Sequence, residues 1–139
     1  MELFANTLQS VEVNQNVMFT DTAISGCQTI IHGAGSGLVT LRGLTNQCRA
    51  RFKVSFGANI GLASGATVAP IEFAIAMNGE PIVSTTMIST PAATLEYQNV
   101  FSETYVEVPR GCCSRVSVVN TGTSAANVIN ANIIIERVA

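Results

Sequence analysis

Hydrophobic and polar residues alternate with a period of two along much of the chain, which is the pattern of half-buried β-strands. The clearest stretch runs over residues 49–56, where apolar side chains at every second position alternate with Arg, Lys and Ser. Residues 71–77 repeat the pattern and run into Asn78-Gly79, a pair typical of a type I′ hairpin turn because both residues tolerate a positive φ. Alternation also predicts strands at 105–108 and 115–118.

Weaker patterns predict short strands at 16–20, 28–32, 38–42, 85–89 and 95–100, and a long last strand over 128–138. Gly, Ser, Thr, Asn and Pro cluster between these strands about every 8–12 residues, the spacing of a sandwich or barrel. No stretch keeps a 3.6-residue period for three turns. We therefore expect an all-β, antiparallel jelly-roll sandwich of nine or ten strands with almost no helix.

The predicted last strand carries apolar side chains on both of its faces. One face buries Ile129, Ala131, Ile133 and Ile135, and the opposite face carries Val128, Asn130, Asn132 and Ile134. Aliphatic side chains and paired Asn residues on an outer face fit a packed, hydrogen-bonded contact with another protein. Charged residues make up only 12% of the chain, about half the usual share, which independently favours such an interface. A polar face with two stray aliphatic side chains remains the alternative.

Length and charge limit the functional classes. A chain of 139 residues forms one domain and buries a sufficient core without a metal or disulfide. A net charge of −2 argues against a protein that follows nucleic-acid phosphates. No apolar run approaches the ~20 residues of a membrane helix, and the N-terminus lacks a secretory signal, so we expect synthesis in a cytoplasm. The cysteines are expected to be free thiols, since a bridge between adjacent residues is strained; they are Cys27, Cys48, Cys112 and Cys113.

Residues for catalysis are scarce. His32 and Asp21 are the only His and Asp, so any His–Asp arrangement must use both. His32 precedes the glycine-rich run 33–37, which has no nucleophile-elbow pattern and lacks the Lys of a phosphate-binding loop. The cysteine spacings contain no CxxC pair, and one Asp cannot build an oxygen cage for calcium. We expect no catalytic, cofactor-binding or metal-binding residue.

Five segments occur in the order seen in a known family. They are Val13-Asn-Gln-Asn-Val-Met-Phe19, Thr29-Ile-Ile-His-Gly-Ala-Gly-Ser-Gly37, Arg51-Phe-Lys-Val-Ser-Phe56, Ala74-Ile-Ala-Met-Asn-Gly79 and Asn132-Ile-Ile-Ile135. Over residues 11–138 the chain resembles bacterial and phage C1q/TNF-like domains, such as the C-terminal heads of collagen-like surface and exosporium glycoproteins of Firmicutes.

The resemblance implies a ten-stranded jelly roll that forms a tight homotrimer, with the first and last strands in the sheet nearest the three-fold axis. That arrangement places the face of Ile134 at a subunit interface. The chain departs from the family at Cys48, where members often carry an aromatic residue, and it shows no Gly-X-Y collagen stem. In this respect it resembles small phage virion proteins that decorate capsids or sit at fibre tips.

We therefore expect residues 1–10 to form an arm and residues 11–139 to form the jelly-roll domain. Leu3, Phe4 and Leu8 give the arm three apolar side chains for docking onto another protein, with a frayed terminus as the alternative. The predicted function is a non-enzymatic, trimeric virion protein that binds capsid or portal-proximal proteins. The alternative is a receptor- or glycan-binding head on a virion or a bacterial cell or spore surface. Neither binds nucleic acid or a membrane.

Overall fold

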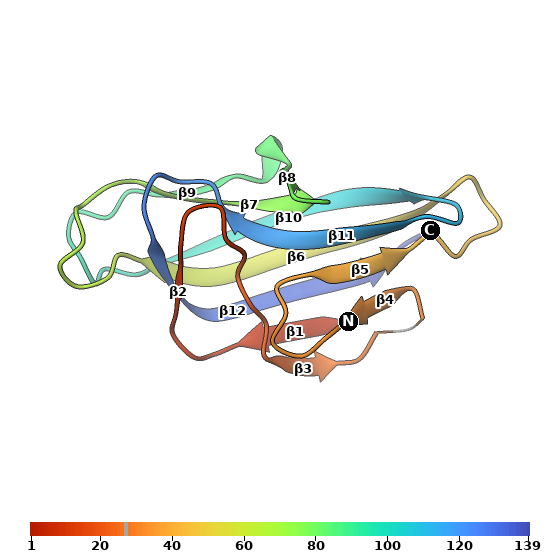
Figure 1. The fold of residues 1–139 in the computed structure, drawn as a ribbon, viewed down its shortest axis with the longest axis horizontal. Coiled ribbons are helices and arrows are strands. Elements are labelled where there is room, and N and C mark those ends of the chain that lie inside the picture. The colour runs from red at the N-terminus through yellow and green to blue at the C-terminus, as the bar shows by residue number, and fades with distance from the viewer. Residues whose placement is uncertain (27) are drawn as a thin grey trace.

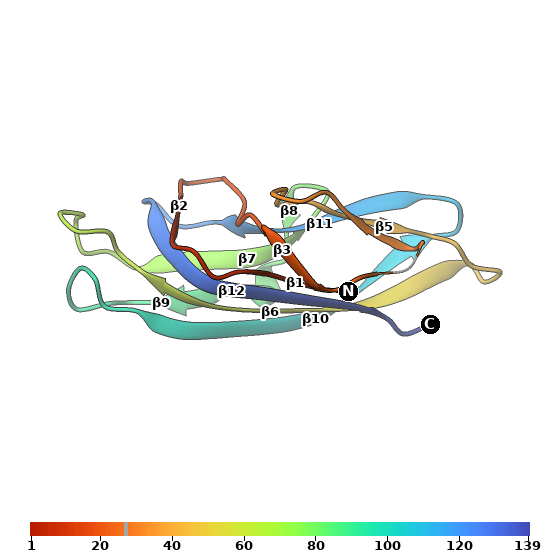
Figure 2. The same cartoon turned by 90° about the horizontal axis from the view of Figure 1, so that it is seen from below.

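Two antiparallel six-stranded sheets pack face to face in the computed structural model, which describes residues 1–26 and 28–139 (Figures 1 and 2). The first sheet has the order β10 (Gln98–Pro109), β6 (Arg49–Gly61), β12 (Ala126–Arg137), β1 (Glu2–Ala5) and β3 (Asp21–Ile24), with β2 (Gln9–Val11) also paired to β12. The second has the order β4 (Ile30–His32), β5 (Val39–Arg42), β11 (Cys113–Asn120), β7 (Ile71–Met77) and β8 (Glu80–Pro81), with β9 (Met87–Ser89) also paired to β7. The predicted all-β sandwich is confirmed.

Helix is nearly absent, as expected. The described residues contain one helical element, the 3-10 turn η1 (Val83–Thr85). No helix in this described part of the chain is long and apolar enough to cross a membrane.

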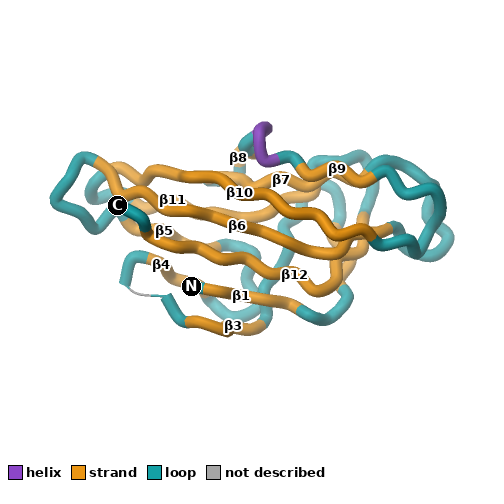
Figure 3. The backbone as a smooth tube through the Cα atoms, turned by 180° about the vertical axis from the view of Figure 1, so that it is seen from behind, coloured by secondary structure: helices purple, strands orange, loops and turns teal. Residues whose placement is uncertain are grey.

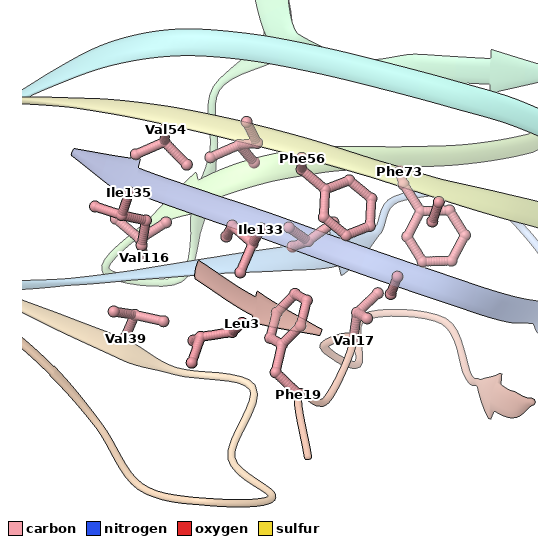
Figure 4. Packing of buried hydrophobic residues seen from close by; sticks show 14 of the residues in the cluster. Leu3, Val17, Phe19, Val39, Val54, Phe56, Phe73, Val116, Ile133 and Ile135 are labelled. Carbon is pink, nitrogen blue, oxygen red and sulfur yellow. The ribbon is translucent and has the colours of Figure 1, made fainter. Parts of the chain in front are cut away.

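The core fills the space between the sheets with the apolar halves of the alternating strands (Figure 4). Phe52, Phe56 and Phe73 point inward from β6 and β7 and are at most 1% exposed. Phe19 lies between the sheets and meets Phe56 edge to face, with ring centroids 6.2 Å apart and an interplanar angle of 78°. This geometry is preferred by aromatic quadrupoles and adds to the burial energy.

Several strand predictions match the structure and others do not. Alternation located β6 and β7, and the predicted hairpin joins β7 to β8 with Asn78 and Gly79 at φ values of 53° and 84°. The strand expected at 16–20 is reduced to one bridge between Asn16 and Val119. Strand β3 was not predicted, because all four of its residues are exposed and show no alternation.

The N-terminal residues are part of the sandwich, so the predicted boundary between an arm (residues 1–10) and a domain is wrong. Strand β1 lies between β12 and β3, and β2 pairs with β12. Leu3 is fully buried in the core, whereas Phe4 faces outward and Leu8 is 50% exposed. The predicted docking role of Leu3 is therefore wrong, because its side chain already has partners within the chain.

A β-bulge in the last strand corrects a second prediction. The register of β12 against β6 shifts between Ile129 and Asn132, and Asn130 has a left-handed backbone with φ of 55°. The extra residue reverses the side-chain alternation, since a slip of one residue exchanges the two faces of a strand. Val128 therefore points into the core and is 0% exposed, so it is not an interface residue.

Candidate protein interface

The outer face of the first sheet is the strongest candidate site (Figure 3). Strands β10, β6, β12, β1 and β3 lie side by side in that order, and their registers align the outward residues in rows across the sheet. One row runs Glu103, Ser55, Ile134, Glu2, Ile24. The next runs Phe101, Gly57, Asn132, Phe4, Asp21. We call these two rows, with Tyr105, the sheet face.

Large apolar side chains are exposed across the sheet face. Phe101 is 62% exposed, Tyr105 61%, Ile24 60% and Ile134 41%. A hollow of about 330 Å³ separates Phe101 from Ile134, with Lys53, Ser55, Glu103 and Glu136 completing its lining. Single exposed aliphatic residues need no explanation, but several large apolar side chains on one sheet face indicate a contact surface.

The ring of Phe101 lies against Gly57, the residue opposite it on β6. A Cβ atom at Gly57 would lie 3.7 Å from Cδ2 of the Phe101 ring, which is ordinary van der Waals contact. The ring therefore leans over the glycine and covers its backbone, as aromatic side chains do beside glycine in sheets. The ring thus presents an apolar surface on the outer side of β10, which is an edge strand of the first sheet.

Amide side chains form a row of hydrogen bonds, here called the amide ladder, beside the ring of Phe101. Nδ2 of Asn99 donates to Oδ1 of Asn59 at 3.1 Å, and Nδ2 of Asn59 is 3.4 Å from Oδ1 of Asn130. Asn132 donates from Nδ2 to Oε2 of Glu2 at 2.6 Å. The ladder fixes these side chains in one arrangement and leaves free lone pairs and N–H groups toward the exterior.

Three ion pairs border the sheet face toward the start of β6. Nζ of Lys53 is 3.5 Å from Oε2 of Glu103, which also accepts a 2.8 Å hydrogen bond from Oγ of Ser55. Arg51 and Arg49 approach Glu107 at 3.5 and 3.7 Å. Positive and negative groups on this border are thus paired within the chain, although exposed pairs of this kind add little stability.

The predicted interface residues divide between the two sides of the sheet. Asn130, Asn132 and Ile134 lie on the outer side, as predicted, while Val128 lies in the core. The structure puts the aromatic side chains of Phe101 and Tyr105 on the outer side as well, with Tyr97 directly before their strand. Phe4 joins them, although it was predicted on an arm; its alternation with buried Leu3 could have revealed this.

His32 and Asp21 form no catalytic pair in the described residues. Nε2 of His32 lies 2.8 Å from the carbonyl oxygen of Ser36 and so carries the donated hydrogen, and Nδ1 is buried without a partner. Asp21 is exposed and accepts a hydrogen bond from Thr20 at 3.0 Å. Within the same residues no group of three or more His, Cys, Asp or Glu side chains could hold a metal ion.

Three of the four cysteines are free and exposed; they are Cys48, Cys112 and Cys113. They gather at one end of the sandwich, where the loop after β5 meets the turn between β10 and β11. The backbone N–H of Arg110 donates to the carbonyl oxygen of Cys48 at 2.9 Å. Cys27 lies outside the described residues.

No protein-family model matches the chain, and no curated protein matches it either. Among solved structures, the globular domain of zebrafish complement 1qA protein is similar with a TM-score of 0.61 and 10% sequence identity, covering 96% of this chain and 93% of that one. The C-terminal domain of EclA, a sugar-binding protein, gives 0.44 at 15% identity over 95% of this chain and 80% of that one. The CBM35 module of Cellvibrio japonicus Abf62 gives 0.40 at 12% identity over 100% and 98%.

The chain therefore has the jelly-roll fold of the C1q globular domain. The likeness to the two carbohydrate-related modules is too low to carry an argument about this chain.

Proposed function

We propose that this protein is a non-enzymatic head module that assembles as a homotrimer through the sheet face. The observation that supports this is the exposure of four large apolar side chains on one face of the first sheet, with Phe101 and Ile24 both at least 60% exposed. Large apolar side chains gathered on one face of a protein mark an interaction site more often than single exposed ones do. Because these side chains are 41–62% exposed in the single chain, burial of each contributes about half of the roughly 1.5–3 kcal/mol of a fully exposed side chain.

The polar groups of the sheet face are compatible with burial. Lys53 and Glu103 neutralise each other, whereas Glu2 and Asp21 each accept one hydrogen bond, from Asn132 and Thr20, so a second copy must supply further donors to these two carboxylates. Asn59 and Asn130 retain amide groups that can form hydrogen bonds across an interface and fix its register. Closed rotational symmetry is the usual solution for identical subunits, and a three-fold arrangement follows the resemblance noted in the sequence.

Attachment to a phage particle is the setting we propose for the trimer. Its mechanism is geometric: three copies around an axis match a symmetric attachment point formed by capsid or portal-proximal proteins. The chain is made in the host cytoplasm and acts on the virion. Electron microscopy of particles labelled with an antibody against this protein tests the setting, and particles that never carry the label contradict it.

A receptor- or glycan-binding head is the second candidate, favoured by the exposed ring of Phe101 beside the amide ladder of Asn99, Asn59 and Asn130. An aromatic face with neighbouring amides is suited to a polar, ring-shaped ligand. Both functions use the same surface, so they exclude each other.

Sedimentation equilibrium at micromolar concentration distinguishes the candidates. A mass three times the 14.6 kDa of the chain supports the trimer, and a monomer contradicts it. A glycan array probed with wild-type protein and with Phe101→Ala then tests the second candidate.

A further inference from the structure

The fold segregates charge that is spread out in the sequence. All seven Lys and Arg residues lie at the end of the sandwich where β5, β10 and β12 finish and β6 and β11 begin. The turn between β10 and β11 and the loop after β5 meet there, since the N–H of Gly43 donates to the carbonyl oxygen of Cys112 at 2.8 Å. Five of the nine acidic residues also lie toward this end; they are Glu2, Glu80, Glu103, Glu107 and Glu136. The net charge of −2 for the whole chain does not reveal that the basic residues gather at one end.

The basic residues at this end differ in how they are paired. Arg49, Arg51 and Lys53, on the first sheet, take part in all three ion pairs found among the described residues. On the second sheet, Arg42 and Arg115 have no ion pair with any described residue, and Nη1 of Arg42 makes a long contact of 3.4 Å with the carbonyl oxygen of Gln28.

Arg42 and Arg115 lie close together. Arg42 is directly opposite Cys113 in the register of β5 and β11, and Arg115 is two residues further along the same face. Diagonal neighbours in a sheet are about 7–8 Å apart, within reach of two long side chains. Arg110 is exposed in the adjoining turn and also lacks an ion pair among the described residues. Two guanidinium groups without an ion pair on one outer face, with a third in the adjoining turn, call for an anionic partner.

The surroundings of these arginines favour a polypeptide as the partner. Ile31, opposite Thr40 in the sheet, is 47% exposed, and Leu38 is 38% exposed on the same face. Aliphatic side chains beside guanidinium groups fit a segment that carries both acidic and apolar residues. The described outer side of β4, β5 and β11 presents no aromatic ring, the group that stacks on nucleic-acid bases.

We propose that the arginine patch, formed by Arg42, Arg110 and Arg115 with Ile31 and Leu38, docks an acidic segment of another protein. The guanidinium groups bind carboxylates through paired hydrogen bonds, and the aliphatic side chains cover the apolar residues of the segment. The patch is on the sheet opposite the proposed trimer interface, so the inference does not depend on trimerisation. In a trimer the patch occurs three times, which raises the avidity for a repeated partner.

Fluorescence anisotropy with a labelled acidic peptide tests the proposal. The probe is a short peptide of Glu residues interspersed with Leu, compared with the same peptide in which Gln replaces Glu. We expect the Glu peptide to bind at low salt and to weaken as salt increases, because the contact is electrostatic. Arg42→Gln combined with Arg115→Gln should weaken it by about tenfold or more, since charge-assisted pairs are lost. Arg42→Lys combined with Arg115→Lys should recover only part of the affinity, because Lys keeps the charge without the paired geometry.

The matched control changes net charge equally at the other end of the molecule. Thr67→Glu combined with Thr123→Glu lowers the net charge by two, as the loss of two arginines does, at exposed positions remote from the patch. Measured at about 0.1 M salt, where the Debye length is about 10 Å, it should weaken binding less than about threefold, because its charges are screened from the patch. Equal weakening in both double variants would overturn the proposal in favour of net charge alone. Tighter binding of oligothymidylate or of polygalacturonate, or no binding of the Glu peptide at low salt, would also overturn it.

Discussion

Leu3 and Ile133 face each other in the register of β1 and β12, and both side chains are 0% exposed. They join opposite ends of the chain in one core cluster (Figure 4). The amino group of Met1 extends this contact by donating to the carbonyl oxygen of Ile135 at 2.7 Å. The first strand therefore closes the gap between β12 and β3 and belongs to the folding unit.

Leu3→Ala should lower the free energy of unfolding by about 2–5 kcal/mol, because it removes a fully buried side chain and leaves a cavity. Leu8→Ala is the matched control: the side chain is 50% exposed, so the loss should stay within about 0.5 kcal/mol. Urea denaturation followed by circular dichroism measures both. Equal, small losses would mean that the first strand is dispensable.

Asn130 should tolerate glycine but not a β-branched residue. Its left-handed backbone, with φ of 55°, costs roughly 1–2 kcal/mol for most side chains, and Asn and Gly adopt it most readily. Asn130→Gly should therefore leave stability nearly unchanged, while Asn130→Val should lose about that amount. If both variants melt alike, the left-handed backbone at position 130 carries no cost for a β-branched side chain, which contradicts the prediction.

Alternation was sufficient to predict strands that have one buried and one wet face. Strands β6 and β7 and the hairpin at Asn78-Gly79 are such cases. It failed at β3, an edge strand with no buried residue, and at Val128, where one inserted residue reverses the faces. A bulge is set by backbone conformation and by the partner strand, neither of which a single strand pattern contains.

The candidate site was predictable in part for the same reason. Ile134 could be placed on an outer face by alternation alone, and the structure agrees. The rows that bring Ile134 beside Ser55 and Glu2 depend on pairing between distant strands. The clustering of Arg42 with Arg115 also depends on such pairing. The sequence shows that these arginines lie near the ends of predicted strands, but it does not show that the end of β5 pairs with the start of β11.

Asn120→Ala should be among the more damaging single substitutions. Asn120 is 0% exposed; its Nδ2 donates to the carbonyl oxygens of Val11 and Ser124, both at 3.0 Å, and its Oδ1 accepts from the N–H of Gly122 at 2.9 Å. Removing the amide leaves buried backbone groups unpaired, which costs about 1–3 kcal/mol for each group. Asn46→Ala, at an exposed position, should cost less than about 0.5 kcal/mol in the same urea titration. A similar loss for both would show that water replaces the missing amide.

The three described cysteines should be dispensable for folding. Cys48, Cys112 and Cys113 are exposed and free, so replacing all three with Ser should change the free energy of unfolding by less than about 0.5 kcal/mol per site. In protein purified without reductant, a colorimetric thiol reagent should modify all three without denaturant. Loss of reactive thiols together with a dimeric or trimeric band on non-reducing gels would instead show bridges between subunits.

Ile134→Asp should separate the subunits without unfolding them. Ile134 is 41% exposed in the single chain, so a charged side chain there remains solvated in a monomer. In the proposed trimer the carboxylate would be buried without a partner, beside Glu2 across the strand pair, at a cost of about 3–5 kcal/mol. Sedimentation should therefore give one chain mass for the variant and three for the wild type, with circular dichroism unchanged. Ile88→Asp makes the same substitution on the outer side of β9, at a side chain that is 61% exposed, and should remain a trimer. If Ile134→Asp stays trimeric with wild-type stability, the sheet face is not the interface, and the contact must lie on another surface of the sandwich.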